Sequence, residues 1–528
     1  MTQDDRLNFL LKQSRDRRSF LRNSFYAMSA WPLLVGNPLL PRVLSRTPFA
    51  DYPFQLGLAS GDPAADGFVL WTRLAPKPLE DGGMPLVNIA VDWQVSKDEN
   101  MTQVVAKGQT IATPELGHSV HVEVKGLESD RWYFYQFKAG GELSPVGRTR
   151  TAPAKDAMLD KFQFAFASCQ HFESGYYTAY EHMLKEPLDL VVHLGDYIYE
   201  YAGKDNRVRK HLGPEINSVE DYRRRISQYK MDPALQAMHA AVPWIVTWDD
   251  HEFDNNYANA ISEEAGIVKE AFLKRRANAY QAYYEHMPLR KASIPRGPDM
   301  KLYRNVAFGR LLEFDVLDTR QYRTDQPCGD KSGPLCEGAY DSKATMMGRK
   351  QERWLARQLR KSKAEWNVLA QQVMMAKIDR DAGEKKRYSV DQWPGYEVSR
   401  KKLMEFLSKD VVSNPVVLTG DIHSNWVNEL KVDYDRAGSQ TVAAEFVGTS
   451  ITSGGDGIFK PQNLDGLLSD NPCLKFHSRE RGYVKCTVTP KTWQSDYQAV
   501  EYVTKPGAPL ITRASFVVEN GRKVIEKA

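Results

Sequence analysis

The stretch LVVHLGDYIYEY, residues 190–201, combines an apolar run with a carboxylate and nearby tyrosines. Its apolar residues run without regular polar alternation into Gly195 and Asp196, and Tyr199 follows shortly after. A continuous apolar run is typical of a strand that is covered on both faces. A carboxylate at the end of such a strand is costly unless it is paired or binds a cation. The stretch therefore predicts a buried strand that ends at a functional site.

Similar runs recur along the second part of the chain, separated by stretches of helical character. The runs are FQFAFAS (162–168), PWIVTW (243–248), LLEFDVLD (311–318), WNVLAQQ (366–372) and NPVVLTG (414–420). The helical stretches cover residues 174–186, 269–286 and 349–362. Covered strands that alternate with helices indicate an α/β domain with a layered core sheet. We assign this domain to residues 160–528.

Residues 51–150 have a different texture, with short aromatic and β-branched runs between turns. Val120, Val122 and Val124 alternate with polar residues, which is typical of a half-buried strand. About seven such strands in ~100 residues predict a small β-sandwich of the immunoglobulin or fibronectin type. Residues 150–158 form a predicted linker to the larger domain.

The first 50 residues contain the motif RRSFLR, with paired arginines at Arg17 and Arg18. The motif resembles a twin-arginine export signal, although Asp16 stands where Ser or Thr is usual. The alternative is a basic, amphipathic N-terminal helix. Export implies the twin-arginine export machinery as a partner and a periplasmic or extracellular location. No apolar stretch reaches the ~18–20 residues of a spanning helix, so we expect no transmembrane anchor.

The charge balance and the cysteines narrow the possibilities further. The net charge is only +4, which indicates no specific nucleic-acid partner. The chain has five cysteines. In an oxidising compartment the close pairs Cys328/Cys336 and Cys473/Cys486 are candidate disulfides, which leaves Cys169 unpaired.

Residue types that bind metals follow several predicted strands. These strand ends contain Cys169, Asp196, Tyr199, Asp250, His251, Asn256, Asp421 and His423. A phenolate and a thiolate suit ferric iron, which favours Tyr199 and Cys169 as its ligands. The alternatives are a buried structural thiol at Cys169 and a core aromatic at Tyr199. Asp249 is either a ligand or a supporting residue.

The ordered motifs GDYIY (195–199), DDHE (249–252) and GDIH (420–423) resemble those of the PhoD-like phosphatases and phosphodiesterases. This is the alkaline phosphatase D family, which is related to the purple acid phosphatases within the metallophosphatase superfamily. The resemblance covers most of the chain. It implies an α+β four-layer sandwich metallophosphatase domain behind an N-terminal β-sandwich, and a centre that contains Fe(3+) and Ca(2+).

The resemblance also implies roles for the strand-end residues. Asp196 matches the aspartate that bridges two metals, and Tyr199 matches the iron-binding tyrosine. Cys169 and His423 complete the implied iron site. Asp250 and Asp421 stand where the related purple acid phosphatases have amide and imidazole ligands, and hard oxygen ligands favour calcium. A further calcium would use Asn256 or its neighbours, and the sequence leaves that choice open.

The implied activity is that of a secreted, metal-dependent phosphoesterase. It hydrolyses phosphate esters by attack of a metal-bound hydroxide held near Asp196. His251 contacts the phosphate or protonates the leaving oxygen. Two alternatives stay open: a phosphodiesterase directed at phospholipid or teichoic acid, and a non-catalytic extracellular binding module.

Overall fold

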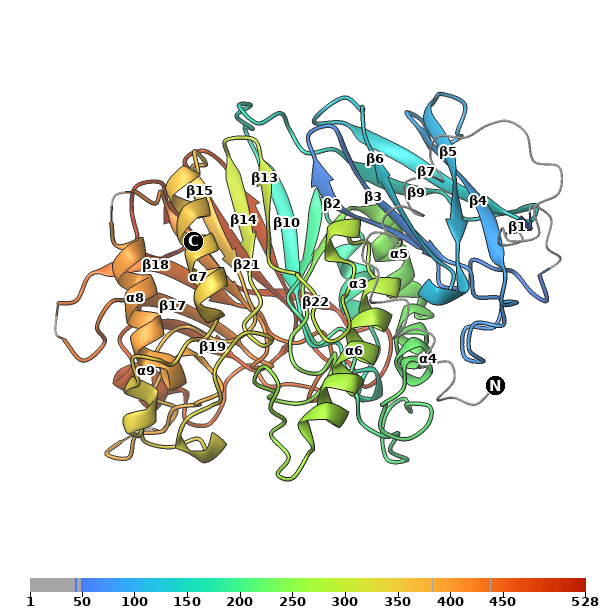
Figure 1. The fold of residues 1–528 in the computed structure, drawn as a ribbon. Coiled ribbons are helices and arrows are strands. Elements are labelled where there is room, and N and C mark those ends of the chain that lie inside the picture. The colour runs from blue at the N-terminus through green and yellow to red at the C-terminus, as the bar shows by residue number, and fades with distance from the viewer. Residues whose placement is uncertain (1–42, 45–48, 382, 410, 437) are drawn as a thin grey trace. The chain divides into compact units, whose positions relative to one another are not determined.

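The computed structural model describes residues 43–44 and 49–528, apart from 382, 410 and 437 (Figure 1). The candidate export motif at Arg17 and Arg18 lies outside these residues. Within the described part of the chain, no helix combines the length and apolarity that a membrane span requires. The described residues form three β-sheets and two layers of helices.

The largest sheet has ten strands in the order β23-β22-β21-β20-β10-β11-β12-β2-β3-β6. Its central strands β10, β11, β12 and β2 are parallel, and the outer strands are antiparallel. The bounds are β2 Leu58–Ala64, β3 Gly67–Arg73, β6 Ser119–Val124, β10 Phe162–Ala167, β11 Leu190–His193, β12 Trp244–Val246, β20 Arg481–Val488, β21 Thr492–Val500, β22 Leu510–Glu519 and β23 Glu526–Lys527.

A seven-stranded sheet follows the order β13-β14-β15-β16-β18-β17-β19, with β14, β15, β16 and β18 parallel. The bounds are β13 Arg304–Phe308, β14 Leu312–Val316, β15 Trp366–Ala370, β16 Pro415–Thr419, β17 Asn425–Lys431, β18 Thr441–Val447 and β19 Leu474–Ser478. The predicted covered strands correspond to β10, β11, β12, β14, β15 and β16.

Seven α-helices and six short 3-10 helices complete the two layers. The bounds are α3 Thr178–Met183, α4 Val219–Lys230, α5 Pro233–Ala241, α6 Lys269–His286, α7 Gly348–Lys361, α8 Glu397–Leu407, α9 Leu464–Asp470, η1 Pro114–Leu116, η2 Phe172–Ser174, η3 Lys291–Ser293, η4 Cys328–Asp330, η5 Glu337–Tyr340 and η6 Trp393–Tyr396, as counted over the described residues. Local signals start some of them: Ser218 and Asp221 form a capping box on α4, and the Asp232 carboxylate caps α5.

The layers are held by three apolar cores. The two large sheets face each other across one core, to which Phe164, Phe166, Phe314 and Phe446 contribute. Helices α3 to α6 cover the outer face of the ten-stranded sheet. Helices α7 to α9 cover the outer face of the seven-stranded sheet (Figure 1). The arrangement is helices, sheet, sheet and helices, so strands in both sheets are covered on both sides, as their apolar runs predicted.

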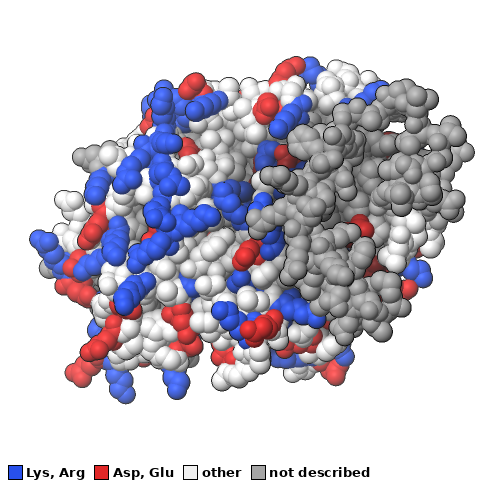
Figure 2. All heavy atoms as spheres, in the orientation of Figure 1, with Lys and Arg blue, Asp and Glu red and all other residues white. Residues whose placement is uncertain are grey.

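Helix α7 shows how the outer layer meets water. It buries Leu355 and Leu359 and exposes Arg353, Arg357 and Arg360. Figure 2 shows Lys and Arg gathered on the face where α7 lies in Figure 1. The spacing of three to four residues is that of an amphipathic helix, so the apolar stripe faces the sheet and the cations stay hydrated.

The N-terminal region contributes a six-stranded sheet with the strands β1 Val43–Leu44, β4 Asn88–Ser96, β5 Val104–Ala112, β7 Trp132–Ala139, β8 Glu142–Leu143 and β9 Gly147–Arg150. This sheet packs through its own apolar core on β2, β3 and β6. Those three strands also extend the ten-stranded sheet, because β2 pairs with β12 at Gly61 and Trp244. A Cβ at residue 61 would lie 2.7 Å from the Trp244 carbonyl oxygen, so the approach requires glycine.

The cysteines divide into one disulfide and three buried thiols. Cys328 and Cys336 form a disulfide, which confirms that predicted pair. The predicted disulfide between Cys473 and Cys486 is wrong, because both cysteines are free thiols. Cys486 lies on β20 in the core between the two large sheets, whereas Cys473 packs in the core under α7 to α9. Nearness in the sequence therefore did not indicate that the two side chains enter different cores.

Asp315 on β14 provides a test of how burial couples to pH. Burial raises its pKa to about 8, although a hydrogen bond from Asn305 Nδ2 (2.8 Å) partly offsets this effect. Between pH ~4 and 8 the folded chain keeps a proton that the unfolded chain loses, so the free energy of unfolding falls as pH rises. Asp315→Asn removes this titration. When the pH is raised from 5 to 9, the melting temperature of Asp315→Asn should therefore rise by at least about 2 °C relative to that of the wild type. Parallel melting curves across that range would contradict the burial argument.

Candidate metal centre

The strand ends that the sequence singled out converge at the carboxyl edges of the parallel strands. Cys169 follows β10, Asp196 follows β11, and Asp421 and His423 follow β16. All four have left-handed backbone conformations, with φ between 54° and 63°. This conformation is uncommon for residues other than glycine and concentrates at functional sites. The sharp turns leave these side chains close together at the ends of their strands.

The first cluster brings together sulfur, oxygen and nitrogen donors from three strand ends. Ligand atoms of Cys169, Asp196 and His423 lie within 4.8 Å of one another. The Tyr199 hydroxyl donates to Asp196 Oδ2 (2.9 Å), lies 3.0 Å from His423 Nε2 and accepts a hydrogen bond from Ser453 (2.7 Å). The structure therefore places all four residues of the implied iron site in one group.

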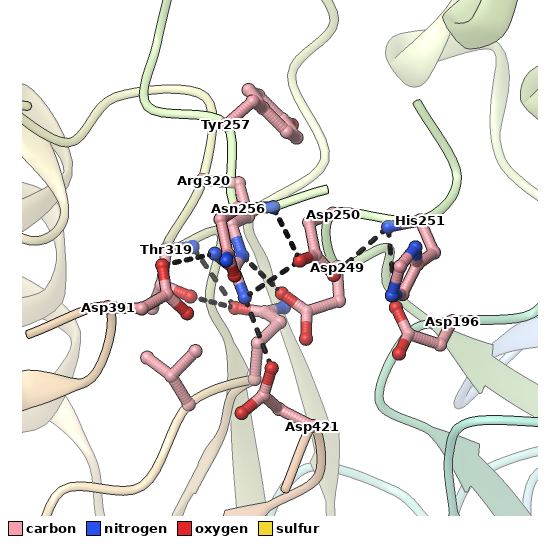
Figure 3. A network of polar contacts seen from close by, with 12 residues as sticks. Asp196, Asp249, Asp250, His251, Asn256, Tyr257, Thr319, Arg320, Asp391 and Asp421 are labelled. Atoms are coloured by element: carbon pink, nitrogen blue, oxygen red, sulfur yellow. Dashed lines mark hydrogen bonds and ion pairs between the residues drawn. The ribbon is translucent and has the colours of Figure 1, made fainter. Parts of the chain in front are cut away.

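A second cluster, which consists of Asp196, Asp249, Asp250, His251 and Asp421, shares Asp196 with the first. Ligand atoms of Asp196, Asp250 and His251 lie within 4.8 Å of one another, and the same holds for Asp249, Asp250 and Asp421 (Figure 3). Asp196 thus lies between two groups of donors, which is the position that a bridging carboxylate requires.

Asn256 supports the second cluster through its backbone. Its N–H donates to Asp250 Oδ2 (2.8 Å), while its side-chain amide donates to Glu263 (2.9 Å). Asp254 instead pairs with Arg275 and Ser262. The backbone N–H of Asp254 also contacts Asp250, but it donates to the carbonyl oxygen (2.8 Å). Of these two, Asn256 is therefore the one that donates to the Asp250 carboxylate.

Arg320 lies between the carboxylates of the second cluster and was missed by the sequence analysis (Figure 3). It donates to Asp249 (2.5 Å), Asp391 (2.7 Å) and Asp421 (3.2 Å), and it lies 3.5 Å from Asp250. Burial opposes its charge, but these carboxylates outweigh burial and raise its pKa well above the ordinary value. Arg320 follows the end of β14, so an arginine just beyond a covered strand was the available signal.

His251 has a carboxylate partner that the sequence analysis also missed. Its Nδ1 lies 2.8 Å from Glu200 Oε2, and Glu200 is itself buried. Burial disfavours the imidazolium, but Glu200, Asp250 and Asp196 outweigh burial and raise the pKa of His251 well above its ordinary value. The pair holds Nδ1–H towards Glu200 and leaves Nε2 as the second proton-bearing nitrogen.

The electrostatics of the first cluster fit a bound cation. Burial and the Asp196 charge raise the pKa of the Cys169 thiol well above its usual range, and the same two causes raise the pKa of Tyr199. Burial and the nearby Arg481 lower the pKa of His423 to about 3, so its imidazole is neutral. The anionic forms of these buried groups repel one another. A bound metal ion would remove this repulsion and stabilise the thiolate, the phenolate and the carboxylate.

The second cluster fits a cation less completely, because Arg320 already compensates its carboxylates. Asp250 also accepts from the backbone N–H of His251 (3.0 Å) and of Asn256. Asp421 accepts from Gln392 (2.9 Å). Oxygen donors remain the dominant type in this group, which is the chemistry that calcium prefers over zinc.

Glu252 ties two strand-end loops together. Its buried carboxylate accepts hydrogen bonds from the backbone N–H of Asp196 (3.0 Å), Tyr197 (2.6 Å) and Asp249 (2.8 Å). The first two residues follow β11 and the third follows β12. Glu252 therefore positions the donors without belonging to either cluster. It lies inside the DDHE motif, but the sequence analysis assigned it no role.

We expect Glu252→Gln to lower both stability and activity. The amide NH₂ of glutamine would face backbone donors, which leaves at least one of three buried N–H groups unpaired. We expect a loss of about 1–3 kcal/mol in the free energy of unfolding and a ~10-fold or larger loss of kcat from misplaced donors. Denaturant unfolding and steady-state kinetics measure the two effects. Wild-type kcat in a destabilised variant would show that Glu252 supports the fold and not the site.

The clusters open into a cleft of about 490 Å³. Tyr199, His251 and His423 of the two clusters line it, and His171, Lys204 and Arg207 are among its other lining residues. A solute that enters the cleft can therefore reach these residues of the two clusters.

The chain resembles known proteins over most of its length. A family model described as PhoD-like phosphatase matches residues 164–497, and a model of the N-terminal domain of PhoD-like phosphatases matches residues 41–153. Alkaline phosphatase D of Bacillus subtilis (strain 168) is 52% identical over 484 residues, which cover 91% of this chain and 83% of that protein.

The solved structures extend the likeness to the fold. The structure of PhoD superposes with a TM-score of 0.89 at 52% identity, covering 91% of this chain and 93% of that one. Purple acid phosphatase PPD1 from yellow lupin (Lupinus luteus) seeds has a TM-score of 0.55 at 12% identity, covering 88% and 73%. At that identity the second likeness concerns the fold alone.

Proposed function

This chain belongs to the PhoD-like phosphatase family and is a phosphoester-hydrolysing enzyme, and from this premise we propose that it is a metal-dependent alkaline phosphatase and phosphodiesterase. The observation that carries the metal proposal is the first cluster, in which a thiol, a phenol, a carboxylate and an imidazole from three strand ends converge on one point. Such a donor set suits a ferric ion.

The ligand assignment follows from the two clusters. Cys169, Asp196, Tyr199 and His423 would hold Fe(3+). Asp196, Asp250 and Asp421, with Asn256 beside them, would hold Ca(2+). When bound, the two cations supply an activated water and draw the negative charge of the phosphate.

The chain's own residues carry out the remaining steps. His251 is held by Glu200 through Nδ1, so its Nε2–H can donate a hydrogen bond to the phosphate and then a proton to the leaving oxygen. Glu252 and Arg320 keep the donors in place and limit their movement during the reaction.

The decisive assay compares p-nitrophenyl phosphate with bis-p-nitrophenyl phosphate, before and after treatment with a chelator. We expect metal-replete protein to release p-nitrophenol from at least one ester and to lose this activity when the metals are removed. Restoring iron and calcium should restore activity. No turnover of either ester by protein with full metal content would overturn the proposal and favour a binding module.

Cys169→Ser tests the iron site separately from activity. Serine keeps the size of the side chain but replaces a soft thiolate with a hydroxyl, which is a weaker ligand for iron. We expect iron content by elemental analysis to fall to less than about half of the wild-type value. Calcium content should change less, because Cys169 belongs only to the first cluster. Wild-type iron content in a folded variant would remove Cys169 from the ligand set.

Export and the N-terminal sandwich are also part of the proposal. The paired Arg17 and Arg18 support the twin-arginine route, and cell fractionation of an R17K/R18K variant tests it, since retention in the cytoplasm is expected.

The packing of β2, β3 and β6 on β4, β5, β7 and β9 supports an immunoglobulin- or fibronectin-type sandwich. Independent cooperative unfolding of residues 51–150 would support a separate domain.

A further inference from the structure

One wall of the cleft carries positive charge that the proposed reaction does not use. The loop of residues 203–212 contains four Lys and Arg side chains. Arg209 pairs with Asp232 (2.7 Å), and Lys210 pairs with Asp205. Lys204 and Arg207 are exposed, line the cleft, and have no carboxylate partner within 4.0 Å among the described residues. The two unpaired cations are therefore available to an anion that enters the cleft.

The loop is held against the cleft wall by a buried carboxylate. Glu173 in η2 accepts hydrogen bonds at Oε1 from the backbone N–H of Lys204 and of His211, both at 2.9 Å. Its carbonyl oxygen accepts from Val208 (3.0 Å) and Arg209. These contacts fix both ends of the segment that carries Lys204 and Arg207. A fixed backbone lowers the entropic cost of binding a ligand there.

His171 supplies an independent observation on the same wall. Its side chain is only 8% exposed, lines the cleft, and its Nε2 has no hydrogen-bond partner. Nδ1 lies 2.6 Å from Ser174 Oγ, and the ring packs on Tyr199 with centroids 4.5 Å apart. When the Ser174 hydroxyl donates to Nδ1, the neutral ring presents Nε2–H as a donor. Other buried polar atoms of the described residues also lack partners, but His171 Nε2 is the one such atom among the residues that line the cleft, so it is available to a ligand there.

We propose that Lys204, Arg207 and His171 form a second anion subsite, which binds a phosphate group beside the one that is hydrolysed. The inference rests on the proposed function and names a substrate class for it. Preferred substrates are phosphate esters with a second phosphate close to the scissile one. Two sources share this chemistry: a terminal phosphate on a small molecule and the next phosphate of a phosphodiester chain. Arg207 suits either one, because a guanidinium can bind phosphate oxygens through two N–H groups.

Two substrates that differ by one phosphate test the subsite. Thymidine 5′-(p-nitrophenyl phosphate) is compared with the same compound carrying a 3′-phosphate, and initial release of p-nitrophenol is measured for both. We expect wild-type kcat/KM to favour the 3′-phosphorylated compound by at least about tenfold at low salt, with the ratio falling as salt screens the cations. A third compound with the 3′-phosphate capped as its methyl ester separates the two sources. Preference for the capped compound points to chain phosphates, and loss of preference points to terminal ones.

Variants connect this ratio to the residues. In K204A/R207A we expect the preference to fall to about twofold or less. H171F keeps aromatic packing on Tyr199 but removes the Nε2 donor, and we expect it to lower the preference about threefold. K210A is the matched control, because Lys210 lies in the same loop, pairs with Asp205 and does not line the cleft. It should retain the wild-type ratio.

The proposal fails in two ways that are distinct from failure of the proposed function. A wild-type enzyme that hydrolyses the reference ester but shows a ratio near one has no second subsite. A folded K204A/R207A variant with the wild-type ratio would show that these cations do not form it. Absence of any turnover by metal-replete wild type, in contrast, would overturn the phosphoesterase proposal itself.

Discussion

Replacing Asp196 with asparagine should reduce kcat/KM for p-nitrophenyl phosphate by at least about 10³-fold. Asp196 is the one residue that belongs to both donor clusters, and it also accepts the hydrogen bond of Tyr199. Asparagine has nearly the same shape but one oxygen fewer, so it cannot offer an anionic oxygen to each cluster. Steady-state kinetics and elemental analysis should therefore show losses of activity and of metal together.

The stability of this variant distinguishes a site effect from a folding effect. Burial is the largest cause that raises the pKa of Asp196 well above its ordinary value, so its charge is unfavourable in the metal-free chain. We therefore expect metal-free Asp196→Asn to melt no lower than the metal-free wild type. Asp435→Asn, at an exposed carboxylate that pairs with Lys377, is the control for activity. An Asp196 variant with more than about a tenth of wild-type kcat/KM would exclude a bridging role.

Replacing Arg320 with methionine should cost about 3–5 kcal/mol of unfolding free energy at pH 8. The change removes a buried guanidinium from Asp249, Asp391 and Asp421 and leaves their charges uncompensated. Burial already raises the pKa of Asp421 to about 6, and loss of the cation moves it further up. Protonation of these carboxylates in the folded chain relieves the repulsion, so the penalty should shrink as pH falls from 8 to 5.

Denaturant unfolding of metal-free protein at the two pH values measures this effect. Arg400→Met is the matched control, because Arg400 is equally buried but pairs with the single carboxylate Glu397 on α8 and lies away from the cleft. It should lose stability with a weaker dependence on pH. Equal penalties for Arg320→Met at pH 5 and pH 8 would mean that the carboxylates around Arg320 do not respond as one charged group.

Much of the fold was predictable because strand burial leaves a local mark. The apolar runs at 162–168, 243–248 and 414–420 became β10, β12 and β16, each covered on both faces. The helical stretch at 269–286 matches α6 residue for residue. The pairing of β2 with β12 could not be predicted in the same way, because it depends on the space that Gly61 leaves beside a strand from another part of the chain.

The residues of the site also fall into those that the sequence made recognisable and those that it did not. Asp196 and Tyr199 could be found because a carboxylate or phenol after a covered strand is conspicuous in the sequence. Arg320, Glu200 and Glu252 also follow covered strands, but their roles depend on partners that approach from other parts of the chain, and the sequence does not identify those partners. The wrong pairing of Cys473 with Cys486 has the same origin, since closeness along a chain does not report which core a side chain enters.

The covered strands and the donor types that follow them could be recognised from the sequence, because burial and ligand chemistry act on each residue locally. Which donors share a cluster, which cations compensate them and which cations of the described residues remain unpaired on the cleft wall all depend on contacts between distant parts of the chain. Electrostatic interaction depends on distance and on burial, and both are set by how the sheets pack.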